Sequence, residues 1–123
     1  MTNWLTPGEF TKKDLEYYRK ERFNTDYIRF MKTWEILREE VKRVNPGDVK
    51  KDLILELSIK KISRMSGFSG DIVRKRLKEM KDFGVIDYDM VGRGRTTEIY
   101  FSYGKESSYL DKMLEKDRRE KLL

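Results

Sequence analysis

The sequence predicts a mostly helical α+β protein, and three observations carry this prediction. Apolar residues recur at steps of three and four along several segments, which is the spacing of amphipathic helices. Two later segments alternate apolar and polar residues, as strands do. The chain has 123 residues, which is enough for one domain with helical extensions and too few for two independent cores.

The N-terminal part predicts two helices. Thr11 is a candidate N-cap, with Asp14 three positions later, for a helix over about Lys12 to Phe23. Thr25 is the expected cap of a second, longer helix that ends near Val44, before a turn that contains Pro and Gly.

The second helix carries a heptad-like seam of apolar residues. Its members alternate at steps of four and three: Phe23, Tyr27, Phe30, Trp34, Leu37, Val41 and Val44. Two interpretations stay open, packing against the domain's own core and contribution to a dimer interface. The second interpretation draws on this helix and on a last helix from about Ser107, with the candidate interface residues Tyr27, Phe30, Trp34, Leu37, Tyr109, Leu110, Met113 and Leu114.

A strand and two helices are predicted in the middle of the chain. The apolar run from Asp52 to Leu57 predicts the strand. Ser58 is the expected N-cap of a helix over Ile59 to Ser66, which Gly67 ends.

The next helix is expected over Gly70 to Phe83. Ser69 caps its start, and Gly84 stands where a left-handed C-cap is favoured. One face of this helix is predicted to be buried and carries Val73, Leu77, Met80 and Phe83.

The C-terminal third predicts a hairpin and a last helix. The period-two runs are Val85 to Val91 and Thr96 to Tyr103, and the loop between them has the sequence Gly-Arg-Gly-Arg. The helix from about Ser107 ends in a wholly charged stretch. Two i,i+4 pairs can support that end as an exposed helix, Glu115 with Arg119 and Asp117 with Lys121, at about 0.2–0.5 kcal/mol each. The end is expected to fray unless a partner covers Leu122 and Leu123.

Composition excludes several classes of function. The chain has no Cys and no His, which removes disulfides, thiolate metal sites and the commonest general base. We therefore expect no enzyme activity, no cofactor and no metal. No run reaches the roughly 20 apolar residues of a membrane span, and the start MTNWLTPGEF lacks a signal-peptide core, so a cytoplasmic protein is expected. Few amides with abundant Lys, Glu and Arg resemble the usage of a hyperthermophile, such as an archaeon or its virus.

The net charge of +6 is concentrated in one segment. From Ser58 to Lys81 the chain has eight basic and two acidic residues, which leaves 20 of each sign elsewhere. A solvated helix face is one interpretation of such a run, and an anion-binding surface is the other.

The order helix, strand, helix, tight turn, helix, strand, basic loop and strand resembles the winged helix-turn-helix family of DNA-binding domains. The resemblance covers Thr25 to Tyr103. It is most specific from Ser58 to Leu77, where the family's core residues and turn glycine match Ile62, Gly67, Phe68, Val73 and Leu77. Ser63 and Ser66 depart from the pattern, because Ala and Leu are common there. The resemblance implies an N-terminal lead-in and helix over residues 1–24, a winged helix-turn-helix domain over 25–104, and a C-terminal helix over 105–123 as a candidate dimerisation element.

The resemblance also assigns DNA-binding residues by position. In such domains the second helix of the pair enters the major groove, and the first helix lies across the backbone. The candidates on the recognition helix are Ser69, Gly70, Asp71, Arg74, Lys75 and Lys78. The candidates for phosphate contact are Ser58, Lys60, Lys61 and Arg76, and those on the wing are Arg93, Arg95 and Thr96.

The chemistry of the recognition-helix candidates agrees with this assignment. Arg74 and Lys75 can donate to guanine O6 and N7, and Gly70 lets the helix N-terminus approach DNA closely. Asp71 has two open roles, as an acceptor from cytosine N4 and as a complement to the helix dipole.

The expected function is a sequence-specific regulator of transcription that binds double-stranded DNA as a homodimer. A dimer is expected because one such domain contacts only a few base pairs, and a second half-site multiplies affinity and specificity. The alternative is a winged-helix module in replication, DNA packaging or protein–protein interaction with little sequence specificity. The sequence gives no indication of a small-molecule effector.

Overall fold

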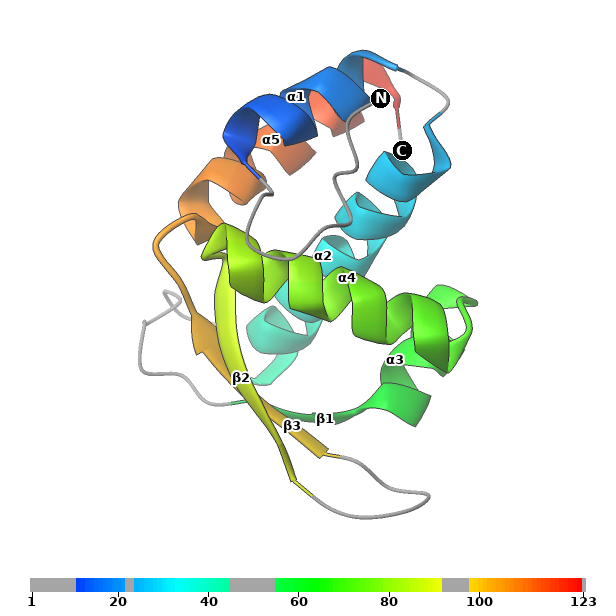
Figure 1. Ribbon diagram of the computed structural model, residues 1–123, viewed down its shortest axis with the longest axis vertical. Helices are drawn as coiled ribbons and strands as arrows, with labels where there is room; N and C mark the ends of the chain where they lie inside the picture. Colours follow the sequence, from blue (N-terminus) through cyan, green and yellow to red (C-terminus); the bar gives the residue numbers. More distant parts are fainter. Residues whose placement is uncertain (1–10, 22–23, 45–54, 92–97, 123) are drawn as a thin grey trace.

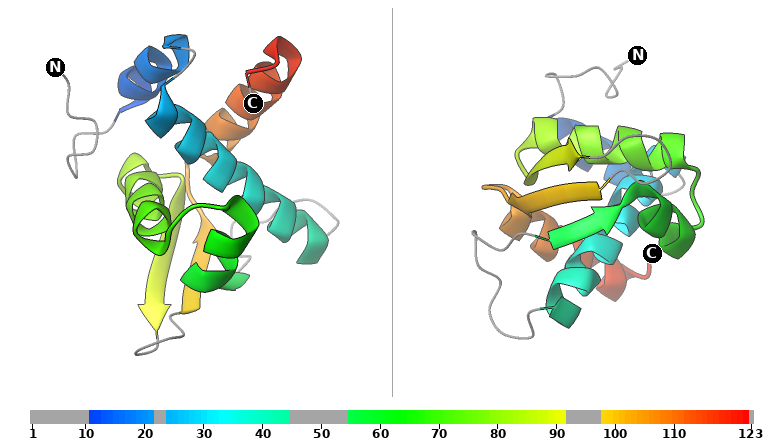
Figure 2. Two further views of the ribbon diagram at one scale, coloured as in Figure 1. Left: turned by 90° about the vertical axis from the view of Figure 1, so that its right-hand side faces the viewer. Right: turned by 90° about the horizontal axis from the view of Figure 1, so that it is seen from below.

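The computed structural model describes residues 11–21, 24–44, 55–91 and 98–122. In chain order the elements are α1 (Lys12–Lys20), α2 (Thr25–Val44), β1 (Leu55–Ser58), α3 (Ile59–Ser66), α4 (Gly70–Phe83), β2 (Ile86–Val91), β3 (Glu98–Tyr103) and α5 (Ser107–Glu120). The expected mostly helical α+β chain with a small sheet is therefore confirmed over these ranges. The sheet lies at one end of the molecule and α1 and α5 at the other, with α2 passing between them (Figures 1 and 2).

The start of α1 follows the local signals in the sequence. The Asp14 backbone N–H donates to Thr11 Oγ1 at 3.3 Å, and the Thr11 backbone N–H donates to Asp14 Oδ2 at 2.9 Å, which completes the predicted capping box. The expected end at Phe23 was wrong, because α1 ends at Lys20 and Glu21 is its C-cap. Phe23 itself lies outside the described residues.

The start of α2 differs from the prediction by one residue. Asn24, not Thr25, supplies the capping group: its side-chain oxygen accepts from the backbone N–H of Asp26 at 3.0 Å and of Tyr27 at 3.1 Å. Thr25 is already the first helical residue and is exposed. Asn is at least as good an N-cap as Thr, so the sequence alone did not separate the two positions.

The apolar seam of α2 faces the chain's own core. Trp34 is fully buried, packs edge-on against Tyr103 of β3 with 5.6 Å between ring centroids, and donates from Nε1 to Asp111 of α5 at 3.2 Å. Val44, the last position of the predicted seam, is 48% exposed. The interpretation of this seam as core packing is the one that the structure supports.

The predicted dimer interface does not hold for most of its residues. Seven of the eight candidates are buried within the single chain, so their side chains offer no surface to a partner: Tyr27, Phe30, Trp34, Leu37, Leu110, Met113 and Leu114. Tyr109 is partly buried against the same core. The physical reason is that α5 lies against α2, and its Asp117 and Glu120 also reach Arg19 of α1.

The sheet is antiparallel and has the strand order β1-β3-β2. The pairing register sets Leu57 opposite Ile99 and Ile86 opposite Tyr103. The two C-terminal strands confirm the expected hairpin partners, and the described part of β1 ends directly at the start of α3. The expected beginning of β1 at Asp52 lies outside the described residues.

The ends of α3 and α4 are where the sequence placed them. Ser58 Oγ accepts from the Lys61 N–H at 3.0 Å, and Ser69 Oγ accepts from the Ile72 N–H at 3.3 Å. Two left-handed glycines act as C-caps, Gly67 with φ 78° after α3 and Gly84 with φ 84° after α4.

The turn between α3 and α4 explains the two serines that depart from the family pattern. The Ser63 hydroxyl donates to the Phe68 carbonyl, and the Phe68 N–H donates to Ser66 Oγ at 3.1 Å. Phe68 itself packs against the core as a partly buried residue. The serines therefore satisfy the backbone of the turn, which Ala and Leu could not do.

The charged end of α5 is tied to its neighbours. Asp117 is fully buried, where it accepts from the Tyr27 hydroxyl and, at 2.5 Å, from Arg19 Nε. Arg118 pairs with Glu35 of α2 at 2.7 Å. The expectation of an exposed Asp117–Lys121 pair was wrong, because the partners of Asp117 come from α1 and α2.

Candidate nucleic-acid interface

The outward face of α4 carries the predicted recognition residues. Asp71, Arg74, Lys75 and Lys78 are all exposed, and at 100° per residue they share one side of the helix. Ser69 and Gly70 stand at the N-terminal end of that side. The opposite side is buried and carries Val73, Arg76, Leu77, Glu79, Met80 and Phe83. We call the exposed group of Asp71, Arg74, Lys75 and Lys78 the α4 outer face.

Asp71 and Arg74 contact each other on the α4 outer face. Arg74 Nη1 lies 3.2 Å from Asp71 Oδ1, while the two side chains are 51% and 89% exposed. An exposed i,i+3 pair of this kind contributes at most ~1 kcal/mol, so a stronger acceptor can take the guanidinium from Asp71. Lys75 and Lys78 make no ion pair with any described residue.

Gly70 is not required by the fold. Its φ is not positive, and a Cβ there would lie 3.4 Å from Arg74 Nη1 and 3.5 Å from Ile59 Cγ2, which are ordinary contacts. The backbone therefore accepts a side chain at this position. The predicted reason for a glycine, close approach to a ligand, stays a prediction.

The phosphate candidates at α3 differ in whether their side chains already have a partner within the protein. Lys60 is exposed and makes no ion pair with a described residue, whereas Ser58 uses its hydroxyl oxygen to cap α3. Lys61 is exposed, but its Nζ lies 3.2 Å from Glu40 Oε1 of α2. Glu40 was not singled out from the sequence. Its hydrogen bonds from Arg43 and Lys61 lower the pKa of its carboxyl group, so it stays ionised beside them.

Arg76 is not available to phosphate, which corrects the prediction. Its side chain is 3% exposed, with Nη1 3.2 Å from Asp26 Oδ1 of α2 and Nε 2.8 Å from Glu79 Oε1. Position 76 lies on the buried side of α4 with Val73 and Leu77, and its guanidinium contacts the start of α2. Arg64 of α3 is exposed, and it was not among the phosphate candidates predicted from the sequence.

Glu79 is the acidic partner in that buried cluster. It is 5% exposed, and burial raises the pKa of its carboxyl group to about 8, although the nearby Arg76 acts in the opposite direction. Its spacing of three from Arg76 was visible in the sequence. Its burial was not, because nothing local shows that this side of α4 meets the start of α2.

The wing candidates Arg93, Arg95 and Thr96 lie outside the described residues. The strands on either side of them are described, and they pair up to Val91 opposite Glu98.

Other kinds of site find little support. The described ranges contain no group of three or more Asp and Glu that could hold a metal ion. Along the same ranges, none of the helices combines the length and apolar character that a membrane crossing needs. Comparison of the chain with protein-family models, with curated proteins and with solved structures gives no match.

Proposed function

We propose that this chain is a sequence-specific regulator of transcription that binds double-stranded DNA through a winged helix-turn-helix. In this proposal α4 is the recognition helix, α3 lies across the DNA backbone and the loop between β2 and β3 is the wing. The observation that carries the proposal is the α4 outer face. It presents three exposed cations, and the opposite side of the same helix is buried in the core.

The arrangement of the elements supports this proposal. The chain order α2, β1, α3, short turn, α4, β2, β3 is the order that the resemblance to winged helix-turn-helix domains predicts, and the three strands form one antiparallel sheet. A helix as regular as α4 fits the B-DNA major groove, which is about 12 Å wide.

The chemistry of the exposed residues supports direct reading of bases. Arg74 can leave its exposed pair with Asp71 for the O6 and N7 atoms of guanine, where the two donors of a guanidinium bind together. Lys75 and Lys78 extend the contact along the groove, and Lys60 is placed on α3 for a phosphate.

The proposed homodimer follows from DNA geometry, since one recognition helix contacts only a few base pairs. Among the described residues, the large exposed hydrophobic side chains are Tyr17, Val44 and Met65, which lie on three different helices. Because they lie on three different helices, we propose that the operator aligns the two copies. The operator is then an inverted repeat, with two chains bound per site.

Selection of bound sequences from a random pool of DNA duplexes, repeated at two salt concentrations, tests the proposal. We expect an enriched inverted repeat with the parent chain. Arg74→Ala should lose preference at one position of each half-site, at a cost of about 1–3 kcal/mol in specific binding. Arg119→Ala is the matched control, because Arg119 is exposed on α5 and makes no ion pair with a described residue.

The outcome of the same selection also decides the alternative. A replication, packaging or protein–protein module with little specificity would enrich no motif, and Arg74→Ala would bind DNA as the parent does. Either result together with unchanged folding of the variant contradicts the regulator proposal.

A further inference from the structure

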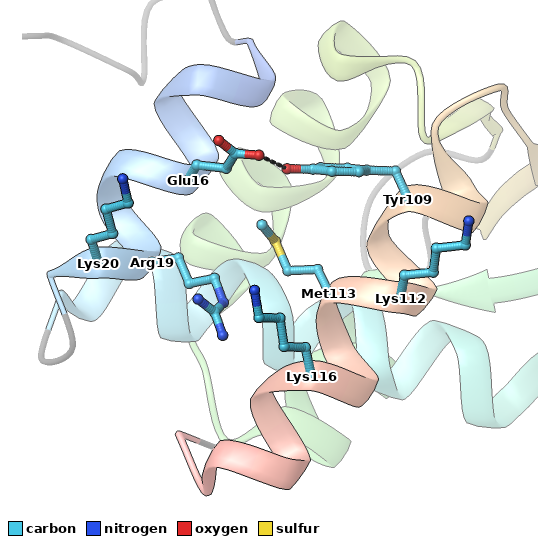
Figure 3. Close-up of a pocket in the computed structure, with 7 residues that line it drawn as sticks. All are labelled: Glu16, Arg19, Lys20, Tyr109, Lys112, Met113 and Lys116. Atoms are coloured by element: carbon cyan, nitrogen blue, oxygen red, sulfur yellow. Dashed lines mark hydrogen bonds between the residues drawn. The ribbon is translucent and has the colours of Figure 1, made fainter.

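A pocket of about 380 Å³ opens between α1 and α5 (Figure 3). These two helices lie at the end of the molecule away from the sheet (Figure 1), and neither carries a residue of the α4 outer face. The volume lies within the range that small-molecule sites occupy. The pocket is therefore a separate feature from the proposed DNA interface.

The lining of the pocket is strongly cationic. Arg19 and Lys20 come from α1, and Lys112 and Lys116 come from α5. Glu16 is the carboxylate of the lining, and Arg19 is also paired with Asp117 and Glu120, so the three lysines carry the excess positive charge. The three lysines make no ion pair with a described residue. Lys112 and Lys116 are four residues apart, which places them on one side of α5. Cations gathered in a concave surface repel one another and attract an anion from solution.

Arg19 is fixed in position before any ligand binds. Its Nε lies 2.5 Å from Asp117 Oδ1, its Nη2 lies 2.5 Å from Glu120 Oε2, and its side chain is only 14% exposed. The same Asp117 accepts from the Tyr27 hydroxyl of α2. One member of the cationic lining is therefore pre-organised by the core, which lowers the entropic cost of ligand binding.

Between the cations the pocket has an aromatic and apolar surface. The Tyr109 hydroxyl donates to Glu16 Oε1 at 3.0 Å, and its ring packs edge-on against Phe83 with 6.1 Å between centroids. Met113 lies beside it and is 7% exposed (Figure 3). A held aromatic ring next to a polarisable thioether is a good surface for a flat ring.

We infer that this pocket binds a small aromatic anion, a flat ring that carries one or two sulfonate, carboxylate or phosphate groups. The ring lies against Tyr109 and Met113, and the anionic group lies by the ammonium group of Lys116, next to Arg19 (Figure 3). An inorganic anion would leave the apolar surface unused, and a neutral ring would leave the cations without a partner. Only a ligand with both parts matches the lining.

Titration of the full chain with 8-anilinonaphthalene-1-sulfonate, followed by fluorescence, tests this inference. We expect saturable binding of one molecule per chain. Lys116→Glu should weaken it on the order of tenfold, the effect of changing the charge by two about 5 Å from an anion in water. Lys13→Glu is the matched control, since it makes the same charge change at an exposed position of α1 that does not line the pocket, and binding should stay within about twofold.

Two competitors distinguish the sources of anionic charge. Inorganic sulfate and a DNA duplex, each added in excess over the dye, should leave the dye bound. Displacement of the dye by sulfate would show that the pocket binds inorganic anions without need of an aromatic ring. Displacement by the duplex would show that the pocket belongs to a nucleic-acid-binding surface. Each result overturns the inference. Equal dye binding by Lys116→Glu and Lys13→Glu overturns it as well. None of these outcomes depends on whether the α4 outer face reads DNA.

Discussion

The two sides of α4 use the same kind of residue in opposite ways. Arg74 and Arg76 are two positions apart, yet the Arg74 side chain is 51% exposed and the Arg76 side chain is 3% exposed. Arg74 meets one exposed carboxylate, whereas Arg76 meets Asp26 and the buried Glu79. A basic run in a sequence therefore mixes cations that can bind a ligand with cations that hold the fold together.

The buried side of α4 also shows how the helical extensions join the domain. Asp26 holds Arg76 of α4, and the next residue, Tyr27, donates its hydroxyl to Asp117 of α5. Adjacent residues at the start of α2 thus contact α4 and α5. We expect α5 to stabilise the same cooperative unit that presents the α4 outer face.

The largest effect is expected from breaking the buried side. At pH 9, above the Glu79 pKa of about 8, Arg76→Ala leaves the buried, ionised Glu79 and the partly exposed Asp26 without their cation, and we expect the free energy of unfolding to fall by about 3–5 kcal/mol. Chemical denaturation followed by circular dichroism measures this. Arg74→Ala is the matched control from the exposed side, with an expected change within about 0.5 kcal/mol. Equal losses in the two variants would contradict the contrast between the two sides.

The free energy of unfolding should also depend on pH through Glu79, on the buried side of α4. Burial raises the pKa of Glu79 from its ordinary 4.5 to about 8, so between these values the folded chain holds a proton that the unfolded chain has released. The contribution of Glu79 to stability is therefore most favourable at acid pH and declines as the pH rises from about 4.5 to 8. One pKa unit corresponds to about 1.4 kcal/mol, so we expect a decline of a few kcal/mol.

Glu79→Gln provides the check on that pH dependence, because an amide of similar shape does not titrate. Unfolding measured at pH 5 and at pH 8 should show a smaller decline for the variant than for the parent. The same comparison with Asp87→Asn, an exposed carboxylate on β2, should reproduce the parental slope. A parental slope in Glu79→Gln would show that its carboxyl group is ionised throughout this range.

The sequence predicted best those features that depend on neighbouring residues. The caps at Ser58 and Ser69 and the left-handed glycines Gly67 and Gly84 were all found, because each signal lies within one helical turn of the end it marks. The exposed set on the α4 outer face followed from helical periodicity in the same way. Local chemistry and periodicity therefore sufficed for the elements and for which side of α4 is exposed.

The end of α1 and the N-cap of α2 were local errors of one to three residues, whereas the errors about packing and the site concern partners distant in the sequence. Arg76 was assigned to phosphate because its partner Asp26 lies 50 positions away, and Asp117 was placed on an exposed helix because Tyr27 lies 90 positions away. The apolar seam of α2 was equally consistent with a second chain and with α5. A periodic pattern shows that a face is buried, but not which element buries it.

A small effect on stability is expected at Gly70, which lies at the N-terminal end of the α4 outer face. Because a Cβ there makes only ordinary contacts, Gly70→Ala should leave the free energy of unfolding unchanged or raise it by up to about 1 kcal/mol, since Ala favours helix. If α4 enters a groove by its N-terminus, the added methyl group should nevertheless weaken binding to the selected operator by several fold. Denaturation and a DNA titration on the same variant separate these two effects. A variant that is as stable as the parent and binds the operator equally well would show that the N-terminal end of α4 does not approach DNA.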